Sequence, residues 1–262
     1  MAIIAVAGGA GKVGCAIVEA IVEQGQHEVV VLSREAKDVK GAKVVAVDYT
    51  DTGRLTEQLE TNKIEIVISI INSLGEVSAE LSLIQAAEKS ASTKRYIPSI
   101  WETKYTPNLE EDLNPRVHSR YPRVVGYFVD YWVTPKVKSY QDPLPLVVGI
   151  ANNYAAVPGS GDELVAFSHT FDVARFVAAL VEAPKWEEES YIIGDKVSWN
   201  QFVQYAEEAK GVKSTVKNDS LELLKKGEIT ELPSPAPVPV PTQGDPAEIV
   251  CGFWAHVCGG SV

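Results

Sequence analysis

Short apolar runs alternate with longer stretches of helical periodicity in the first part of the chain. The run 2–7 is unbroken and apolar, which is typical of a strand buried on both faces. The segment 15–24 then places apolar residues at helical spacing, and Gly25 ends it. A second apolar run follows at 28–32. This order predicts a βαβ unit.

The same alternation continues beyond this unit. We expect further strands at 42–49, 64–71 and 94–99, with helices at about 52–62 and 76–90 between them. Repeated strand–helix pairs predict a Rossmann-like, doubly wound parallel sheet, so the fold class is α/β.

A glycine-rich turn joins the first strand to the first helix. Gly9, Gly11 and Gly14 match the Gly-x-Gly-x-x-Gly pattern of dinucleotide-binding turns. The first glycine permits a tight turn, the second lets the backbone approach a diphosphate, and the third lets helix pack close to strand. Free N–H groups at the helix start, around Lys12 and Val13, would bind the anion. The alternative is a turn that only closes the corner between strand and helix.

The second strand ends in Ser33, Arg34 and Glu35. A carboxylate at this point would accept hydrogen bonds from the adenosine ribose of NAD. A hydroxyl followed by a guanidinium suits a 2′-phosphate instead, because arginine offers forked donors. The sequence therefore favours NADP(H) over NAD. Two alternatives are that Glu35 points to the ribose, and that Arg34 is only a solvated loop cation.

Further cofactor contacts are expected where the other strands end, because ligands of an open parallel sheet bind beyond the carboxyl ends of its strands. Asp48 and Tyr49 follow the third strand and could contact adenine, although a strand-end aspartate can equally serve only its own turn. The candidates after the fourth and fifth strands are Ile71, Asn72, Ser73, Pro98 and Ser99.

Composition and charge exclude several classes of function. The formal charge of −11 on 262 residues argues against a general nucleic-acid surface. No apolar run approaches the roughly 20 residues that a membrane helix needs, and we expect a cytoplasmic protein without a membrane partner. Cys15, Cys251 and Cys258 lack metal-ligand spacing, so neither a metal site nor a disulfide framework is predicted.

Six segments, taken together, resemble the NmrA-like family of atypical short-chain dehydrogenases, which includes isoflavone reductase-like enzymes. They are 6–14, 96–101, 126–131, 155–161, 167–177 and 191–196. The likeness is to the fungal branch, and it implies an NADPH-binding Rossmann domain with a smaller interleaved lobe that shapes a substrate pocket. We place the Rossmann domain at 1–150, the lobe at 151–232, and a proline-rich arm with an apolar tail at 233–262.

Two catalytic features expected from this resemblance are missing. Isoflavone reductase-like members carry a catalytic lysine on a helix after the fifth strand, but 101–123 contains Pro107, Pro115 and Pro122 and leaves no room for that helix. Its one lysine, Lys104, lies very close to the strand end. The usual tyrosine–lysine pair with a spacing of four, which supplies a proton and depresses the tyrosine pKa, is also missing.

The sequence therefore leaves the proton donor unidentified, with Lys104, Tyr105 and His169 as candidates. His169 could pair with Asp172 for proton transfer, or the two could cap the following helix and hold the lobe to the Rossmann domain. Several aromatic residues near the expected nicotinamide end could stack on a flat substrate or could be ordinary core. They are Trp101, Tyr105, Tyr127, Tyr131 and Trp132.

These features predict an NADPH-dependent oxidoreductase that reduces a small aromatic or polyketide-like metabolite by hydride transfer, as a monomer or homodimer. Three alternatives keep the same fold. One is a non-catalytic regulator that senses the NADP pool and binds a protein, and another is a lyase, isomerase or cyclase. The last is a shortened gene copy that cannot react.

Overall fold

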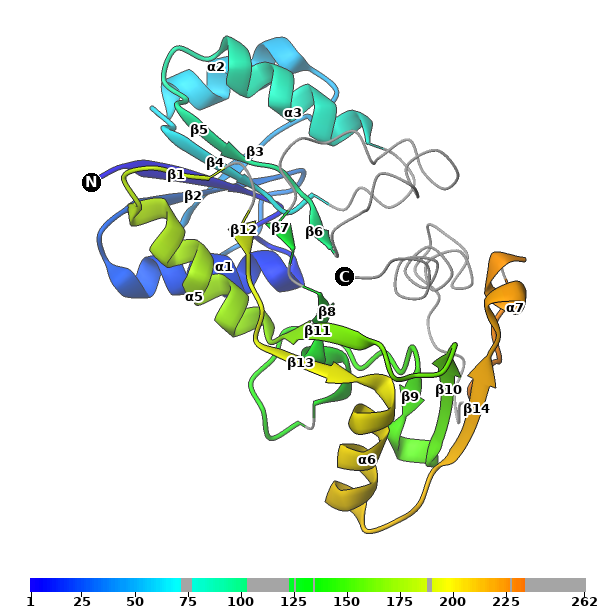
Figure 1. Ribbon diagram of the computed structural model, residues 1–262. Coiled ribbons are helices and arrows are strands. Elements are labelled where there is room, and N and C mark those ends of the chain that lie inside the picture. The colour runs from blue at the N-terminus through cyan, green and yellow to red at the C-terminus, as the bar shows by residue number, and fades with distance from the viewer. Residues whose placement is uncertain are drawn as a thin grey trace.

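The computed structural model combines a helix-covered parallel sheet with a second part made of shorter strands (Figure 1). Among the described residues, no helix is long and apolar enough to cross a bilayer. The described ranges are 1–71, 77–102, 123–124, 126–133, 135–187, 190–226 and 228–233. The intervals 103–122 and 234–262 lie outside them. These intervals contain the segment of the expected crossover, Lys104, Tyr105 and nearly all of the proline-rich arm.

The central sheet has five parallel strands in the order β3-β2-β1-β4-β5. Ala5 in the middle strand lies opposite Val30 on one side and Val67 on the other. The strand order reverses between β1 and β4, which is the point where doubly wound sheets bind their ligands. This confirms the predicted fold class. The strands are β1 Ile3–Ala7, β2 Glu28–Ser33, β3 Lys43–Ala46, β4 Ile66–Ser69 and β5 Arg95–Ile97.

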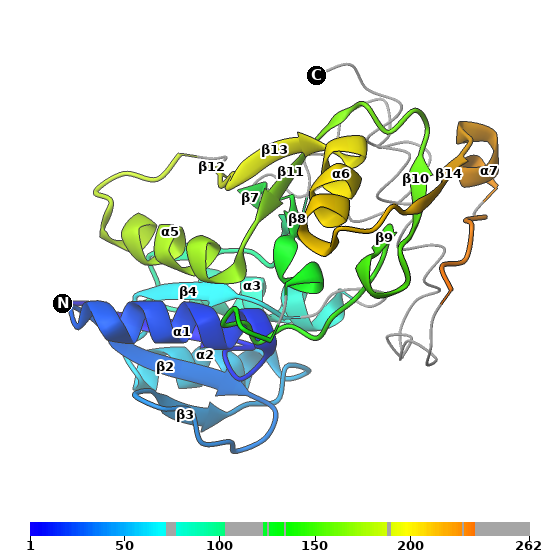
Figure 2. The ribbon, with the colours of Figure 1, turned by 90° about the horizontal axis from the view of Figure 1, so that it is seen from below.

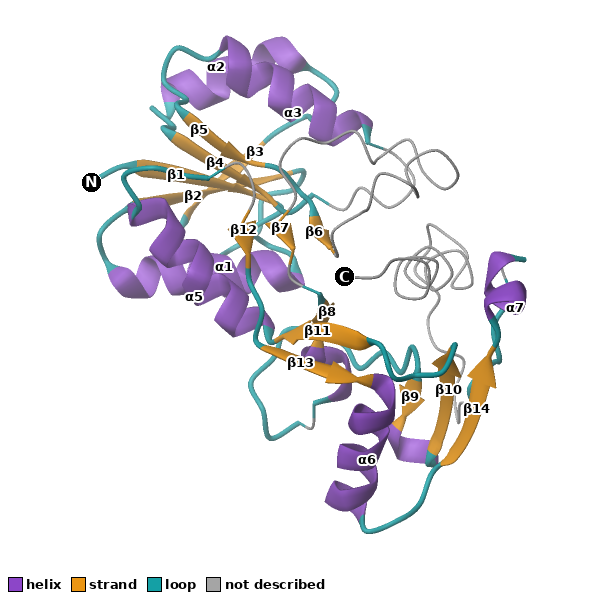
Figure 3. Ribbon diagram, in the orientation of Figure 1, coloured by secondary structure: helices purple, strands orange, loops and turns teal. Residues whose placement is uncertain are grey.

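Two helices cover each face of this sheet (Figures 1 and 3). Helices α1 (Lys12–Gln24) and α5 (Thr170–Glu182) pack side by side on one face, and their apolar stripes join a core with the strands. Helices α2 (Thr52–Thr61) and α3 (Ser78–Lys89) bury the other face. Because α5 comes from the second half of the chain, the two parts of the molecule are interleaved, as expected.

The second part of the molecule is built around two small sheets with the orders β13-β11-β8 and β14-β10-β9. Its core is an aromatic cluster that includes Tyr127, Trp132, Phe167 and Trp199. The elements are β8 Tyr127–Phe128, η2 Val129–Trp132, β9 Val148–Gly149, η3 Ile150–Asn152, β10 Tyr154–Pro158, β11 Leu164–Ser168, β13 Asp195–Ser198, α6 Trp199–Lys210, β14 Thr215–Asp219 and α7 Leu221–Lys225.

A third sheet of three two-residue strands connects the two parts. It pairs β6 (Trp101–Glu102) with β7 (Arg123–Val124), and β7 with β12 (Ser190–Tyr191), all in parallel. Strand β7 thus joins β6 and β12 and does not extend the central sheet beyond β5.

Candidate functional site

The glycine turn lies at the carboxyl edge of the central sheet, between the ends of β2 and β4. Gly8 adopts φ +77°, and its N–H donates to the Leu32 carbonyl at 3.1 Å. The Gly11 N–H donates to the Gly8 carbonyl at 2.9 Å and closes the turn. A left-handed residue followed by this bond folds the chain tightly from β1 into α1.

The glycines of the motif differ in how much room surrounds them. A Cβ on Gly14 would lie 2.3 Å from the Gly8 carbonyl oxygen, so only glycine lets α1 approach the turn. A Cβ on Gly9 would lie 3.0 Å from the Val6 carbonyl oxygen. Beside Gly11, by contrast, only the Gly8 oxygen, at 3.1 Å, comes within 4 Å among the described atoms. Apart from this one close contact, the described atoms leave the space beside Gly11 open to a ligand group.

The start of α1 is not capped by a side chain. Gly11 occupies the N-cap position and supplies no side-chain acceptor, and the first turn contains no acidic residue. The first N–H groups of a helix, here those of Lys12 and Val13, have no intrahelical partner and lie at the positive end of the dipole. In α2 the Asp51 side chain accepts from the Arg54 N–H at 3.0 Å instead. The open start of α1 suits an anion.

The residues after β2 differ in their partners. Arg34 is exposed and makes no hydrogen bond or ion pair with other residues in the described part of the chain. The Glu35 carboxylate lies 3.8 Å from the Lys37 ammonium. The Ser33 hydroxyl accepts a long hydrogen bond, 3.4 Å, from the Glu35 N–H. Of the two charged side chains, Arg34 is therefore the one available to a ligand.

Asp48 and Tyr49 make intramolecular contacts. One Asp48 oxygen accepts from the Thr50 hydroxyl at 2.7 Å and from the Thr50 N–H at 2.9 Å, and these bonds lower the pKa of Asp48. Asp48 makes both bonds within its own turn, and its contact with adenine stays a prediction. Tyr49 is buried, which raises its pKa, and its hydroxyl donates to the Leu32 carbonyl at 3.1 Å. Its ring packs beneath the end of β2.

A buried carboxylate that the sequence did not single out holds the ends of β4 and β5 together. Glu80, in the first turn of α3, accepts hydrogen bonds from the Ser69 hydroxyl, from the Tyr96 hydroxyl at 3.1 Å and from the Ser99 N–H at 3.0 Å. Burial raises the pKa of Glu80. Its sequence signal is an acidic residue on the apolar stripe of the helix, one turn before Leu83.

The predicted contacts after β4 and β5 lie close together where they are described. The hydroxyl of Ser99, the residue after Pro98, donates to the Ile71 carbonyl at 2.7 Å. The indole N–H of Trp101 donates to the Ser69 carbonyl at 2.9 Å, which fixes this half-buried ring at the same edge. Asn72 and Ser73 lie outside the described residues.

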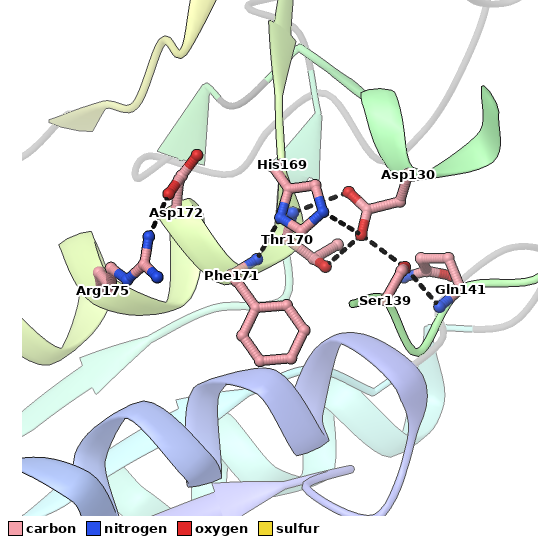
Figure 4. Close-up of polar contacts among 8 residues, drawn as sticks. All are labelled: Asp130, Ser139, Gln141, His169, Thr170, Phe171, Asp172 and Arg175. Carbon is pink, nitrogen blue, oxygen red and sulfur yellow. Dashed lines mark hydrogen bonds and ion pairs between the residues drawn. The ribbon is translucent and has the colours of Figure 1, made fainter. Parts of the chain in front are cut away.

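His169 faces Asp130 and not Asp172, the partner considered for proton transfer (Figure 4). It is the N-cap of α5, and its Nδ1 accepts from the Phe171 N–H at 3.3 Å. Its Nε2 lies 3.6 Å from an oxygen of Asp130, whereas Asp172 turns away and pairs with Arg175 at 2.6 Å. The described geometry forms a helix cap and no His169–Asp172 pair.

Asp130 is the second carboxylate that sequence reasoning missed. It is only 1% exposed and accepts from the Thr170 N–H at 2.8 Å, from the Thr170 hydroxyl and from the Ser139 hydroxyl at 2.7 Å. These bonds attach η2 to the start of α5. Asp130 therefore fixes the second part of the molecule to the helix that covers the central sheet.

The aromatic candidates lie either in the second part of the molecule or at the edge of the central sheet. Tyr127 and Trp132 lie in the core of the second part, with ring centroids 5.4 and 5.7 Å from that of Trp199. Tyr131 packs edge-on against Phe128 at 6.2 Å, and burial raises the pKa of Tyr131 to about 12. Of the described members, Trp101 is the one at the carboxyl edge of the central sheet.

Comparison with known proteins identifies the family. Residues 8–118 match a protein family described as NAD(P)H-binding. Oxidoreductase BOA1 of Botryotinia fuckeliana is 34% identical over 230 residues, which cover 80% of this chain and 76% of the relative. The chain belongs to the NmrA-like family of NAD(P)H-binding oxidoreductases.

Solved structures show the same NmrA-like fold. A crystal structure of isoflavone reductase superposes with a TM-score of 0.68 at 15% identity, over 97% of this chain and 86% of the other. The structure of AtPrR2 with NADP+ and (+)-pinoresinol gives 0.69 at 17% identity, over 100% of this chain and 90% of the other. This NmrA-like chain therefore keeps the architecture of the family across both of its parts.

Proposed function

We propose that this chain is an NADPH-dependent reductase that transfers hydride to a small aromatic or polyketide-like metabolite. The observation that carries the proposal is the open corner beside Gly11, next to a helix start without a side-chain cap. A diphosphate there would accept hydrogen bonds from the backbone N–H groups of Lys12 and Val13. Gly9 and Gly14 keep this corner compact.

The preference for NADPH over NADH rests on Arg34. Its guanidinium is exposed, and the neighbouring Glu35 carboxylate pairs with Lys37. An exposed guanidinium can donate hydrogen bonds to the 2′-phosphate of NADPH, whereas a carboxylate in the same place would repel that phosphate. The solved AtPrR2 complex with NADP+ has the same fold, which agrees with this choice.

The nicotinamide half would lie along the ends of β4 and β5, against Ile71, Pro98 and Ser99, with Asn72 and Ser73 as further contacts. The bound cofactor supplies the hydride, and the chain supplies binding and orientation. Trp101 offers an aromatic face at this edge, which suits a flat acceptor. In this proposal the lobe at 151–232 forms the rest of the substrate pocket.

The test is a titration of the full chain with NADPH and NADH, followed by absorbance assays of the reduced cofactor with a panel of aromatic ketones and enones. Gly11→Ala places a methyl group in the corner and should weaken NADPH binding at least tenfold. Gly53→Ala is the matched control, because a Cβ there meets only an Asp51 oxygen at 3.4 Å. The Gly53→Ala protein should bind NADPH as tightly as the wild type.

Three results would contradict the proposal. Tight NADPH binding without turnover of any acceptor would indicate the regulator. Turnover without added cofactor would indicate a lyase, isomerase or cyclase. Equal NADPH affinities of Gly11→Ala and the wild type would remove the diphosphate from this corner.

A further inference from the structure

The segment 135–146, which we name the strap, lies along α1 between η2 and β9 (Figure 2). Two of its side chains contact the same residue of α1. The Tyr140 hydroxyl donates to Glu19 at 2.7 Å, and the Lys138 ammonium pairs with the other Glu19 oxygen. The Ser139 hydroxyl donates to the buried Asp130 at 2.7 Å. These contacts fix the strap on the helix that follows the glycine turn.

The strap brings a carboxylate to the start of α1. Asp142 forms an ion pair with the ammonium of Lys12, the first residue of the helix and the neighbour of Gly11. Both side chains are largely in solvent, with 49% of Lys12 and 81% of Asp142 exposed. The cation nearest in sequence to the open corner is therefore engaged by an internal anion.

We propose that Asp142 sets the affinity of the glycine turn for its anionic cofactor, by competing with the diphosphate for Lys12. This inference rests on the proposed function, because it requires a diphosphate at the turn. When the cofactor binds, Lys12 exchanges the carboxylate for the diphosphate. Breaking the Lys12–Asp142 ion pair costs the attraction between the two side chains, and this cost weakens cofactor binding.

The expected size of the effect follows from the exposure of the pair. Ion pairs between exposed side chains are weak, because water screens them and two side chains must be ordered. Removing the competitor should therefore tighten binding by about two- to fivefold and not by orders of magnitude. The gain should shrink as salt is raised, because salt screens exposed charges.

The test measures the dissociation constant of NADPH at low ionic strength for wild type, Asp142→Asn, Lys12→Gln and the double variant. Asp142→Asn should bind NADPH about two- to fivefold more tightly than wild type. In the Lys12→Gln background the same change should give no gain. Glu65→Gln is the matched control, since it removes one charge from an exposed pair with Lys94, next to the amino ends of β4 and β5. Its affinity should equal that of the wild type.

Unchanged or weaker binding by Asp142→Asn would overturn the inference while leaving the proposed function intact. A gain that persists in the Lys12→Gln background would also overturn it, because the effect would then be general repulsion. If the wild type fails to bind NADPH at millimolar concentration, the proposed function fails, and the inference fails with it.

Discussion

The close packing of α1 against the glycine turn depends on Gly14. A Cβ there would lie 2.3 Å from the Gly8 carbonyl oxygen and 2.7 Å from the Gly9 Cα. Both are backbone atoms, which cannot move aside by a change of rotamer. Any side chain at this position must push the whole helix start outward.

Gly14→Ala should therefore lower both stability and cofactor affinity. We expect a loss of about 1–3 kcal/mol in the free energy of unfolding, typical of overpacking. Urea denaturation followed by circular dichroism measures this loss, and an NADPH titration measures the affinity. Gly53→Ala, on the exposed surface of α2, is the control. A Gly14→Ala protein as stable as this control would contradict the close packing.

Arg34 is the residue that we expect to separate the two nicotinamide cofactors. Arg34→Asp should raise the Michaelis constant for NADPH by tenfold or more while changing that for NADH much less, because only NADPH carries the 2′-phosphate. Steady-state kinetics with both cofactors measures the ratio. Lys40→Asp, six residues further along the same loop, is the charge-matched control. Equal effects of Arg34→Asp on both cofactors would contradict the assignment.

At this scale the sequence identifies residues that belong to a local pattern. The glycine spacing and the position of Arg34 after a strand are both visible within one βαβ unit. The ion pair of Lys12 with Asp142 spans 130 positions and follows no spacing rule, so it was not predicted. Asp130 was missed for the same reason, because its partner Thr170 is 40 positions away.

Helix α3 contributes a buried charge as well as an apolar face. Glu80, in its first turn, ties β4 to β5 through Ser69 and Tyr96 and reaches the Ser99 N–H. Because burial raises the pKa of Glu80, its proton is bound more tightly in the folded chain than in the unfolded chain. The contribution of this element to stability therefore depends on pH.

The pH dependence of wild type and Glu80→Gln should differ in a defined direction. As pH rises above the ordinary glutamate value of 4.5, the unfolded chain loses this proton before the folded chain does. The unfolding free energy of the wild type should thus fall as the pH rises through the raised pKa of Glu80. The unfolding free energy of Glu80→Gln should not show this fall, because glutamine has no proton to lose. Urea denaturation at a series of pH values measures the difference, with Glu88→Gln on the same helix as control. Parallel curves for wild type and Glu80→Gln would contradict the prediction.

Most elements of the central sheet could be predicted, because buried strands and amphipathic helices each give a recognisable spacing of apolar residues in the sequence. The predicted third and fourth strands, 42–49 and 64–71, extend beyond β3 and β4, since apolar residues continue past the last ladder bond. The small sheet of β6, β7 and β12 was not predicted. Strands of two residues are too short to show any alternation.

The whole molecule is held together through α1 and α5. Helix α1 carries the proposed diphosphate site at its start, and α5 packs along it after leaving β11. Asp130 adds a second connection between the parts. The sequence implied an interleaved lobe through its family resemblance, but the packing of α5 on α1 depends on contacts between distant segments.

NADPH should therefore stabilise both parts of the molecule together. At a concentration one hundred times the dissociation constant, binding adds about 2.7 kcal/mol, which slows exchange by global unfolding about one hundredfold. Hydrogen exchange of the amides in β1 and β11, with and without NADPH, measures the effect in each part. The Gly11→Ala protein at the same concentration serves as control. Slower exchange confined to β1 would show that the parts unfold independently.

The late position of α5 in the chain has a consequence for synthesis. Apolar side chains on one side of α1 leave the ribosome early, but α5, which packs against them, begins only at Thr170. During most of translation these side chains are exposed to water and to neighbouring nascent chains. We expect ribosome-bound chains of this protein to engage chaperones that recognise apolar segments, and to be released from them once the helix ending at Glu182 has emerged.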